Sequence, residues 1–143
     1  MDNLYSDIII HHYKSQSWRG KLHTATHRRT GRNATCGDEI TLYYSLSDNG
    51  IIKDIRFTGK GCMISQASAS IMCETVKGKS VKEISELFTV IGDLLTPPFK
   101  EYTEEEVRKN EYLALSDMHK YPARKKCALL AWKTLIKAIN NDR

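Results

Sequence analysis

The chain has 143 residues, of which 41% are hydrophobic and 27% are charged. This length is typical of one compact domain with its own core, so we expect a single domain over residues 1–143. The composition excludes a disordered chain, and no apolar stretch approaches the roughly 18 residues that a membrane span needs. The formal charge of +5 and the pI of about 9.0 make nucleic-acid binding the first alternative to weigh.

The most basic stretch, HTATHRRTGR at residues 23–32, lacks the aromatic side chains that stack on bases. We therefore predict a solvated strand and loop there, with an acidic protein partner as the functional alternative. We expect neither nucleic acid nor a membrane as a partner. The first residues show no basic region followed by an apolar one, which a secretory signal would require, so we expect a cytoplasmic protein.

The first half of the chain predicts one helix followed by strands. Leu4, Ile8 and His12 recur at helical spacing. β-Branched and aromatic residues in short runs predict three strands, and the Asn49-Gly50 pair between the second and third favours a tight hairpin. The expected elements are a helix over residues 3–14 and strands over residues 21–30, 39–46 and 50–57.

The second half of the chain predicts helices. Ser80 precedes Glu83 by three residues, which is the spacing of a capping box. The expected elements are helices over residues 63–78 and 80–95, a break at TPPF, a charged helix or turn over residues 104–118, and a helix from residue 123 onward. Because strands come early and helices late, we predict an α+β fold with a small antiparallel three-stranded sheet and helices packed on one side.

The four cysteines suit metal or thiol chemistry better than disulfides, since we expect a reducing compartment. Cys36 and Asp38 flank Gly37, so a turn can aim both side chains at one point. Cys62 follows the last strand, and Cys127 lies near the start of a helix whose amides would favour a thiolate. Three thiolates and one carboxylate suit tetrahedral zinc or an iron–sulfur cluster. From spacing alone, three unrelated cysteines remain an open alternative.

Cys73 is the exception among the cysteines. It lies 11 residues after Cys62 on the same predicted helix, which places it about 16 Å further along at about 1.5 Å of rise per residue. That separation is too long for the two to share one metal ion. We predict that Cys73 is a small buried core residue.

Four segments resemble, in order, the U-type iron–sulfur cluster assembly proteins, the family of IscU, SufU and the NifU N-terminal domain. They are LYSDIIIHHYK, NATCGDEITL, GKGCMISQASASIM and YPARKKCALLAWKTL. The resemblance covers nearly the whole chain and implies a SufE/IscU-like fold. The family's metal ligands match Cys36, Asp38, Cys62 and Cys127 of this sequence, and Cys73 matches none.

Two departures distinguish the SufU branch from the scaffold branch, IscU. The scaffold branch carries a histidine before its last cysteine and a chaperone-binding segment, whereas this chain has Lys126 before Cys127 and YPARK in place of that segment. The chain also carries an apparent insertion, LLTPPFKEYTEEEVRKNEY at residues 94–112, which resembles SufU. Arg124 matches an arginine of the same branch.

Similarity to SufU implies a zinc-dependent sulfur acceptor for a PLP-dependent cysteine desulfurase of the SufS type, working with other SUF components. We predict Cys36 as the acceptor, because the turn at Gly37 lets it move, and Arg124 as an auxiliary residue. The alternative is a non-catalytic scaffold that assembles an iron–sulfur cluster on Cys36, Asp38, Cys62 and Cys127. A structural zinc in a small interaction module is a third possibility. We expect a monomer or weak homo-oligomer and interpret His11, His12 and His23 as ordinary surface or core histidines.

Overall fold

Along the chain, three strands follow the first helix, and the remaining helices follow the strands. The computed structural model describes residues 2–141. The elements are α1 (Asp2–Lys14), β1 (His27–Asn33), β2 (Asp38–Leu46), β3 (Ile52–Lys60), α2 (Met63–Val76), α3 (Val81–Leu94), α4 (Glu104–Lys109), the 3₁₀ helix η1 (Glu111–Lys120) and α5 (Pro122–Asn141). Their order confirms the predicted α+β class.

The sheet is antiparallel with strand order β1-β2-β3. The first hairpin pairs Asn33 with Asp38 directly across its turn. This register places β1 at the residues just before the turn, so the predicted strand over residues 21–30 began too early. The strand HRRTGRN carries no large apolar side chain, and the threonines ahead of it gave the misleading alternation. The second hairpin forms as predicted, but its connection between Leu46 and Ile52 is longer than a two-residue turn.

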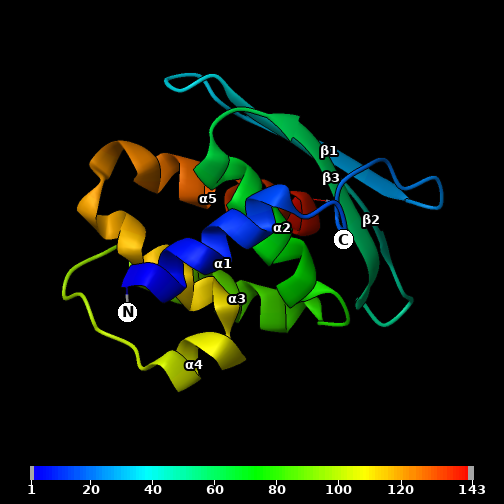
Figure 1. Cartoon of the computed structure of the whole chain (residues 1–143). Coiled ribbons are helices and arrows are strands. Elements are labelled where there is room, and N and C mark those ends of the chain that lie inside the picture. The colour runs from blue at the N-terminus through cyan, green and yellow to red at the C-terminus, as the bar shows by residue number, and fades with distance from the viewer. Residues whose placement is uncertain (1, 142–143) are drawn as a thin grey trace.

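All helices that touch the sheet cover the same face (Figure 1). Helix α2 lies at the centre of this layer and is buried along most of its length, in contact with α1, α5 and β3. Helix α5 approaches β1 so closely that a Cβ atom at Gly31 would collide with the hydroxyl of Thr134. Glycine therefore sets the distance between the last helix and the first strand.

The segment after TPPF forms two short elements. Thr103 and Glu106 make a capping box at the start of α4, and Ser80 and Glu83 make the predicted one at the start of α3. The residues predicted as a charged helix or turn divide into α4 and the 3₁₀ helix η1, whose buried side chains, including Leu113 and Leu115, pack on the core. The sequence pattern did not predict that α4 ends at Asn110, because apolar residues continue through η1.

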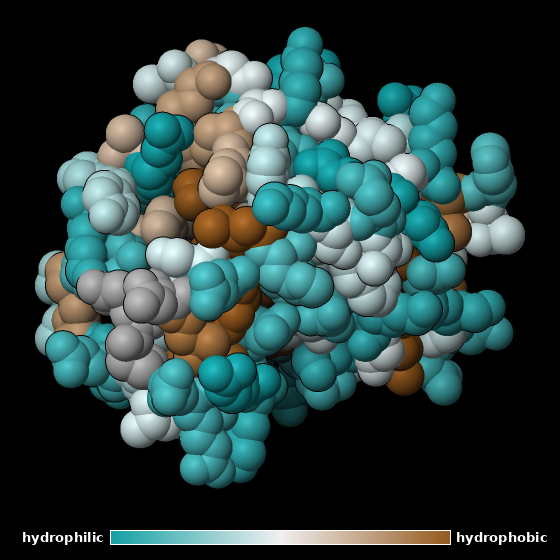
Figure 2. Space-filling model, viewed as in Figure 1, coloured by the Kyte–Doolittle hydropathy of each residue, from teal (hydrophilic) through white to brown (hydrophobic). Residues whose placement is uncertain are grey.

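Hydrophobic side chains gather on the face that carries α1 (Figure 2). We define the apolar patch as Ile10, Met63, Ile64, Met118 and Tyr121, which line two adjoining shallow pockets. Tyr121 is 52% exposed and Met63 is 42% exposed. Among the described residues, no helix has the length and hydrophobicity that crossing a bilayer would require.

Candidate metal centre

Cys36 lies in the turn that joins β1 to β2, as the sequence predicted. The turn occupies residues 34–37, and its backbone is held by a hydrogen bond from the Cys36 N–H to the Asn33 carbonyl at 3.2 Å. Gly37 has a φ of 72°, a conformation that favours glycine. Cys36 is exposed, so its thiol is open to a partner molecule.

Asp38, the first residue of β2, is buried beneath this turn. Its Oδ1 accepts a hydrogen bond from the Cys62 backbone N–H at 2.9 Å, and the Asn33 amide donates to its Oδ2 at 3.5 Å. Gly61 makes this approach possible, because a Cβ atom there would collide with the Asp38 carboxylate. The glycine before Cys62 thus serves close packing against Asp38.

Cys127 comes from α5 and is buried. The helix begins at Pro122, so Cys127 lies beyond the first turn, where the free amides are found. The prediction that these amides favour its thiolate is therefore wrong. Burial first, and then hydrogen bonds with Asp38, Cys62 and Cys36, raise the pKa of Cys127 in the absence of a cation.

The structure brings three of the four predicted ligands together. The ligand atoms of Cys36, Asp38 and Cys127 all lie within 4.8 Å of one another. Cys62 is outside this group, although it lies beside it through the contacts with Asp38 and Cys127. Cys62 completes a four-ligand set only if its sulfur moves toward the other three.

Arg124 reaches the same centre from the first turn of α5. The negative charge of Cys62 and a hydrogen bond to Cys127 raise the pKa of the Arg124 guanidinium. Arg124 is exposed, so it is positioned to meet an incoming anion while offsetting the charge of the thiolates.

Asn33 is a site residue that the sequence did not single out. It is 9% exposed, and its amide lies 3.9 Å from the Cys127 sulfur as well as near Asp38. In the sequence, the one feature that could have indicated Asn33 is its position just before the turn that carries Cys36. The structure adds that the hairpin pairs Asn33 with Asp38.

Cys73 belongs to the hydrophobic core, as predicted, and is fully buried. It therefore contributes nothing to this centre.

The donor set fits a soft or borderline metal. Sulfur ligands select zinc, copper(I) or an iron–sulfur cluster over magnesium or calcium. Four ionised ligands would carry more negative charge than one divalent ion neutralises, and Arg124 lies where it can offset the excess. The exposed Cys36 sets this centre apart from a closed structural site, in which all ligands are fixed.

Comparison with known proteins gives a consistent result. The family model of the NifU-like N terminal domain matches residues 4–142. A protein of Thermotoga maritima named iron-sulfur cluster assembly scaffold protein IscU is 46% identical over 136 residues, which cover 95% of this chain and 92% of that protein. A Bacillus subtilis protein named zinc-dependent sulfurtransferase SufU is 37% identical over 142 residues, covering 99% and 93%.

A solved structure supports the same fold. The crystal structure of a putative iron-sulfur cluster assembly scaffold protein for the SUF system, FiSufU from Fervidobacterium islandicum, superposes with a TM-score of 0.82. It is 36% identical in sequence, and the match covers 96% of this chain and 97% of that one.

Proposed function

We propose that this chain, which belongs to the family of NifU-like N-terminal domains, is a zinc-dependent sulfur acceptor. The process that it serves is iron–sulfur cluster assembly. In this proposal Cys36 takes persulfide sulfur from a PLP-dependent cysteine desulfurase. The relatives carry both the scaffold name and the sulfurtransferase name, so the distinction rests on the residues of this chain.

One observation carries the proposal: the exposed Cys36 stands on a glycine turn above the buried Asp38 and Cys127. A ligand that must leave a metal to react needs access to solvent and a flexible support, and Cys36 has both. The other two donors are fixed by β2 and α5, so they can retain an ion while Cys36 moves.

Asp38, Cys62, Cys127 and Cys36 would hold zinc. Zinc at this position would keep the sulfurs ionised at neutral pH and protect them from oxidation. The chain's own contribution is the arrangement of donors: Asn33 and the Cys62 N–H orient the Asp38 carboxylate, and Arg124 lies against the sulfurs.

The transfer step is a thiol exchange. The Cys36 thiolate attacks the outer sulfur of the desulfurase persulfide and forms a new S–S bond, while the bond between the two sulfurs of the donor breaks. The outer sulfur moves to Cys36 with its proton, and the desulfurase cysteine leaves as a thiolate. Arg124 would offset the negative charge of the attacking Cys36 thiolate and of the departing desulfurase thiolate during the exchange.

The apolar patch is the proposed docking surface for the desulfurase, which we expect to be of the SufS type and to act with other SUF components. Met63 follows Cys62 directly in sequence, and Arg124 lines the same shallow pocket as Tyr121. A partner that covers this patch is therefore next to the sulfur centre. The reducing cytoplasm is the location that we propose, since the chemistry requires free thiols.

A cluster scaffold is the second candidate function, and the 46% identity to a protein named as a scaffold favours it. Under this alternative the same four residues hold iron and sulfide, and the cluster is the cargo. Against it, Lys126 stands where the sequence comparison with the scaffold branch expects a histidine ligand.

The deciding experiment measures turnover of the cognate cysteine desulfurase, as alanine and sulfide, under a mild reductant with and without the zinc-loaded protein. We expect strong stimulation that is lost in Cys36→Ala and kept in Cys73→Ala, the matched control. Asp38→Ala should weaken zinc binding by about 100-fold or more, since even residues that only hydrogen-bond to a metal ligand contribute about 10–100-fold. No stimulation, together with cluster formation when iron is supplied, would favour the scaffold.

A further inference from the structure

His12 is buried in α1, and its ring contacts polar groups on two other elements. The side chain is 3% exposed, and its Nδ1 lies 2.8 Å from Ser70 Oγ in α2. Its Nε2 lies 2.8 Å from Glu111 Oε1 in η1 and 3.6 Å from Glu74 Oε2 in α2. The interpretation of His12 as an ordinary histidine does not explain two carboxylates on one nitrogen.

A single proton does not satisfy this arrangement. One imidazole nitrogen presents at most one N–H, so it donates well to one carboxylate, and the other, on the half-exposed Glu74, is left to solvent. Among the residues that the structure describes, no lysine or arginine forms an ion pair with Glu74 or Glu111. Two carboxylates therefore meet at a buried nitrogen with an excess of negative charge.

The ligand atoms have the spacing of a metal site. Those of His12, Glu74 and Glu111 all lie within 4.8 Å of one another. Tetrahedral zinc with bonds of about 2.0–2.1 Å holds its donors about 3.3 Å apart, and the two distances from the His12 nitrogen, 2.8 and 3.6 Å, fall on either side of that value. The hydrogen bond to Ser70 fixes the ring, as outer partners of metal-bound histidines do.

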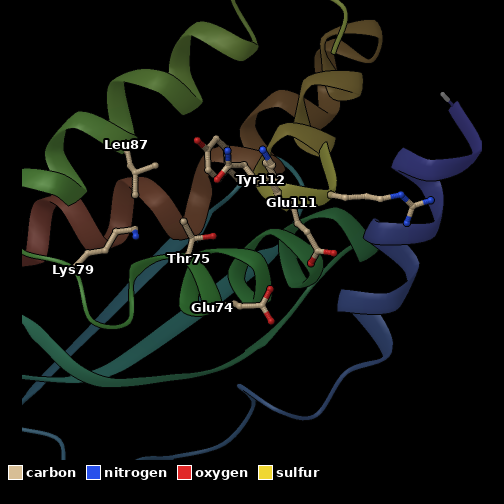
Figure 3. Close-up of a pocket in the computed structure, with 9 residues that line it drawn as sticks. Glu74, Thr75, Lys79, Leu87, Glu111 and Tyr112 are labelled. Carbon is tan, nitrogen blue, oxygen red and sulfur yellow. The ribbon is translucent and has the colours of Figure 1, made fainter. Parts of the chain in front are cut away.

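The carboxylates also face an open space. Glu74 and Glu111 point toward each other from α2 and η1 at the wall of a hollow (Figure 3). The hollow has a volume of about 630 Å³ and is also lined by Lys79, Arg108 and Tyr112. Water or a small anion can reach the cluster from this side and fill the remaining coordination positions.

We propose that His12, Glu74 and Glu111 form a second metal site, which binds a borderline divalent ion of the zinc or ferrous class. An imidazole nitrogen with two carboxylates suits these ions, whereas magnesium and calcium prefer oxygen alone. The two negative charges match the charge of the ion. Bound there, the ion joins α1, α2 and η1 at one point.

This site is separate from the cysteine centre. Glu74 follows Cys62 by 12 residues on α2, which corresponds to about 18 Å at about 1.5 Å of rise per residue. The proposal therefore does not depend on the sulfur-transfer function, and either can fail without the other.

The test counts zinc bound per full-length chain by equilibrium dialysis. We expect two ions in the unchanged protein and one in Glu74→Gln and in Glu111→Gln. Glu105→Gln is the matched control, because it also removes a carboxylate, here from the neighbouring helix α4. The Glu105 side chain is 80% exposed and does not contact His12. Glu74 is half exposed, so its substitution leaves the core intact even if Glu111→Gln disturbs folding.

Cobalt(II) identifies the donors. With the cysteine centre filled by one equivalent of zinc, added cobalt should show ligand-field absorption without sulfur-to-metal charge transfer, and Ser70→Ala should weaken its binding by about tenfold or more. Equal numbers of bound zinc ions in the unchanged chain and in both glutamine variants would overturn the proposal. A second ion that persists in both glutamine variants, or that shows sulfur ligation, would overturn it as well.

Discussion

Individual cysteines in this chain differ by their surroundings rather than by their chemistry. Cys36 is exposed on a turn, whereas Cys73 is enclosed by the core on α2. Burial is the main cause that raises the pKa of the Cys73 thiol, and Asp54 adds to it while Arg56 opposes it. The folded state therefore favours the neutral thiol more strongly than the unfolded chain does.

The sign of this shift gives a pH prediction for Cys73→Ala. The stability that the buried thiol contributes is present below the unfolded pKa of about 8.5 and is lost as pH rises above it. Near neutral pH we expect the free energy of unfolding of the unchanged protein to be about 1 kcal/mol higher than that of Cys73→Ala. The difference should shrink by about 1.4 kcal/mol per pH unit above about 8.5.

Urea unfolding of both proteins at several pH values measures this difference in free energy of unfolding. The other titrating groups are the same in both proteins, so their contributions cancel. A difference that stays constant up to about pH 10 would contradict the shift, since the unfolded thiol ionises near 8.5.

At the scale of elements, the distance between α5 and β1 decides where Cys127 lies relative to Cys36 and Asp38. Gly31 and Thr134 touch at this crossing. The Thr134 hydroxyl also donates a hydrogen bond to the Leu130 carbonyl at 2.7 Å, so it is held in place on the helix. A larger side chain on β1 must therefore either break this hydrogen bond or push α5 away from the sheet.

We predict that Gly31→Ala destabilises the fold by about 1–3 kcal/mol, as overpacking does, and weakens zinc binding because Cys127 moves with α5. Adding Thr134→Ala removes the closest contact and should restore much of both losses. Thermal unfolding and zinc titration of the single and double variants check this. Equal zinc affinity in Gly31→Ala and the unchanged protein would show that the crossing does not position the centre.

Local chemistry made some elements predictable and left others hidden. The turn at Cys36 and Gly37 and the capping box at Ser80 follow from residues next to one another, so the sequence predicted them. The start of β1 depended on pairing with β2, which no local pattern in HRRTGRN reports. The four proposed metal ligands of the cysteine centre came from family resemblance, because their spacing alone left three unrelated cysteines as an open alternative.

The cluster around His12 shows why the sequence could not predict the other features of the structure. Its members lie at residues 12, 70, 74 and 111, on three elements that meet only in the folded chain. Each residue by itself has an ordinary surface or core interpretation. Similarly, the sequence could name Cys62 as a ligand but could not fix the direction of its sulfur, which the structure leaves outside the group of three.

For the molecule as a whole, the hydrophobic core is independent of the cysteine centre. The core runs through the sheet and through α1, α2, α3 and α5, and none of the four proposed ligands belongs to it. The fold should therefore persist without metal, unlike that of a small zinc finger.

Removal of zinc by a chelator tests this independence. Zinc at about 1,000 times its Kd would add about 4 kcal/mol to the free energy of unfolding. For a chain of this size, about 1 kcal/mol shifts Tm by about 2–4 °C, so we expect Tm to fall by about 10 °C when zinc is removed. The far-UV circular dichroism should stay unchanged. Loss of the helical signal on chelation would show that the core depends on the metal.

The cysteine centre has a front and a back, because exposure falls from Cys36 through Cys62 to Cys127. A partner molecule meets the outermost sulfur first and reaches the innermost one only by displacing the turn. An oxidant approaches by the same route. The residue that we propose as the sulfur acceptor is therefore also the one that we expect an oxidant to attack first, with the inner donors spared as long as that turn remains in place.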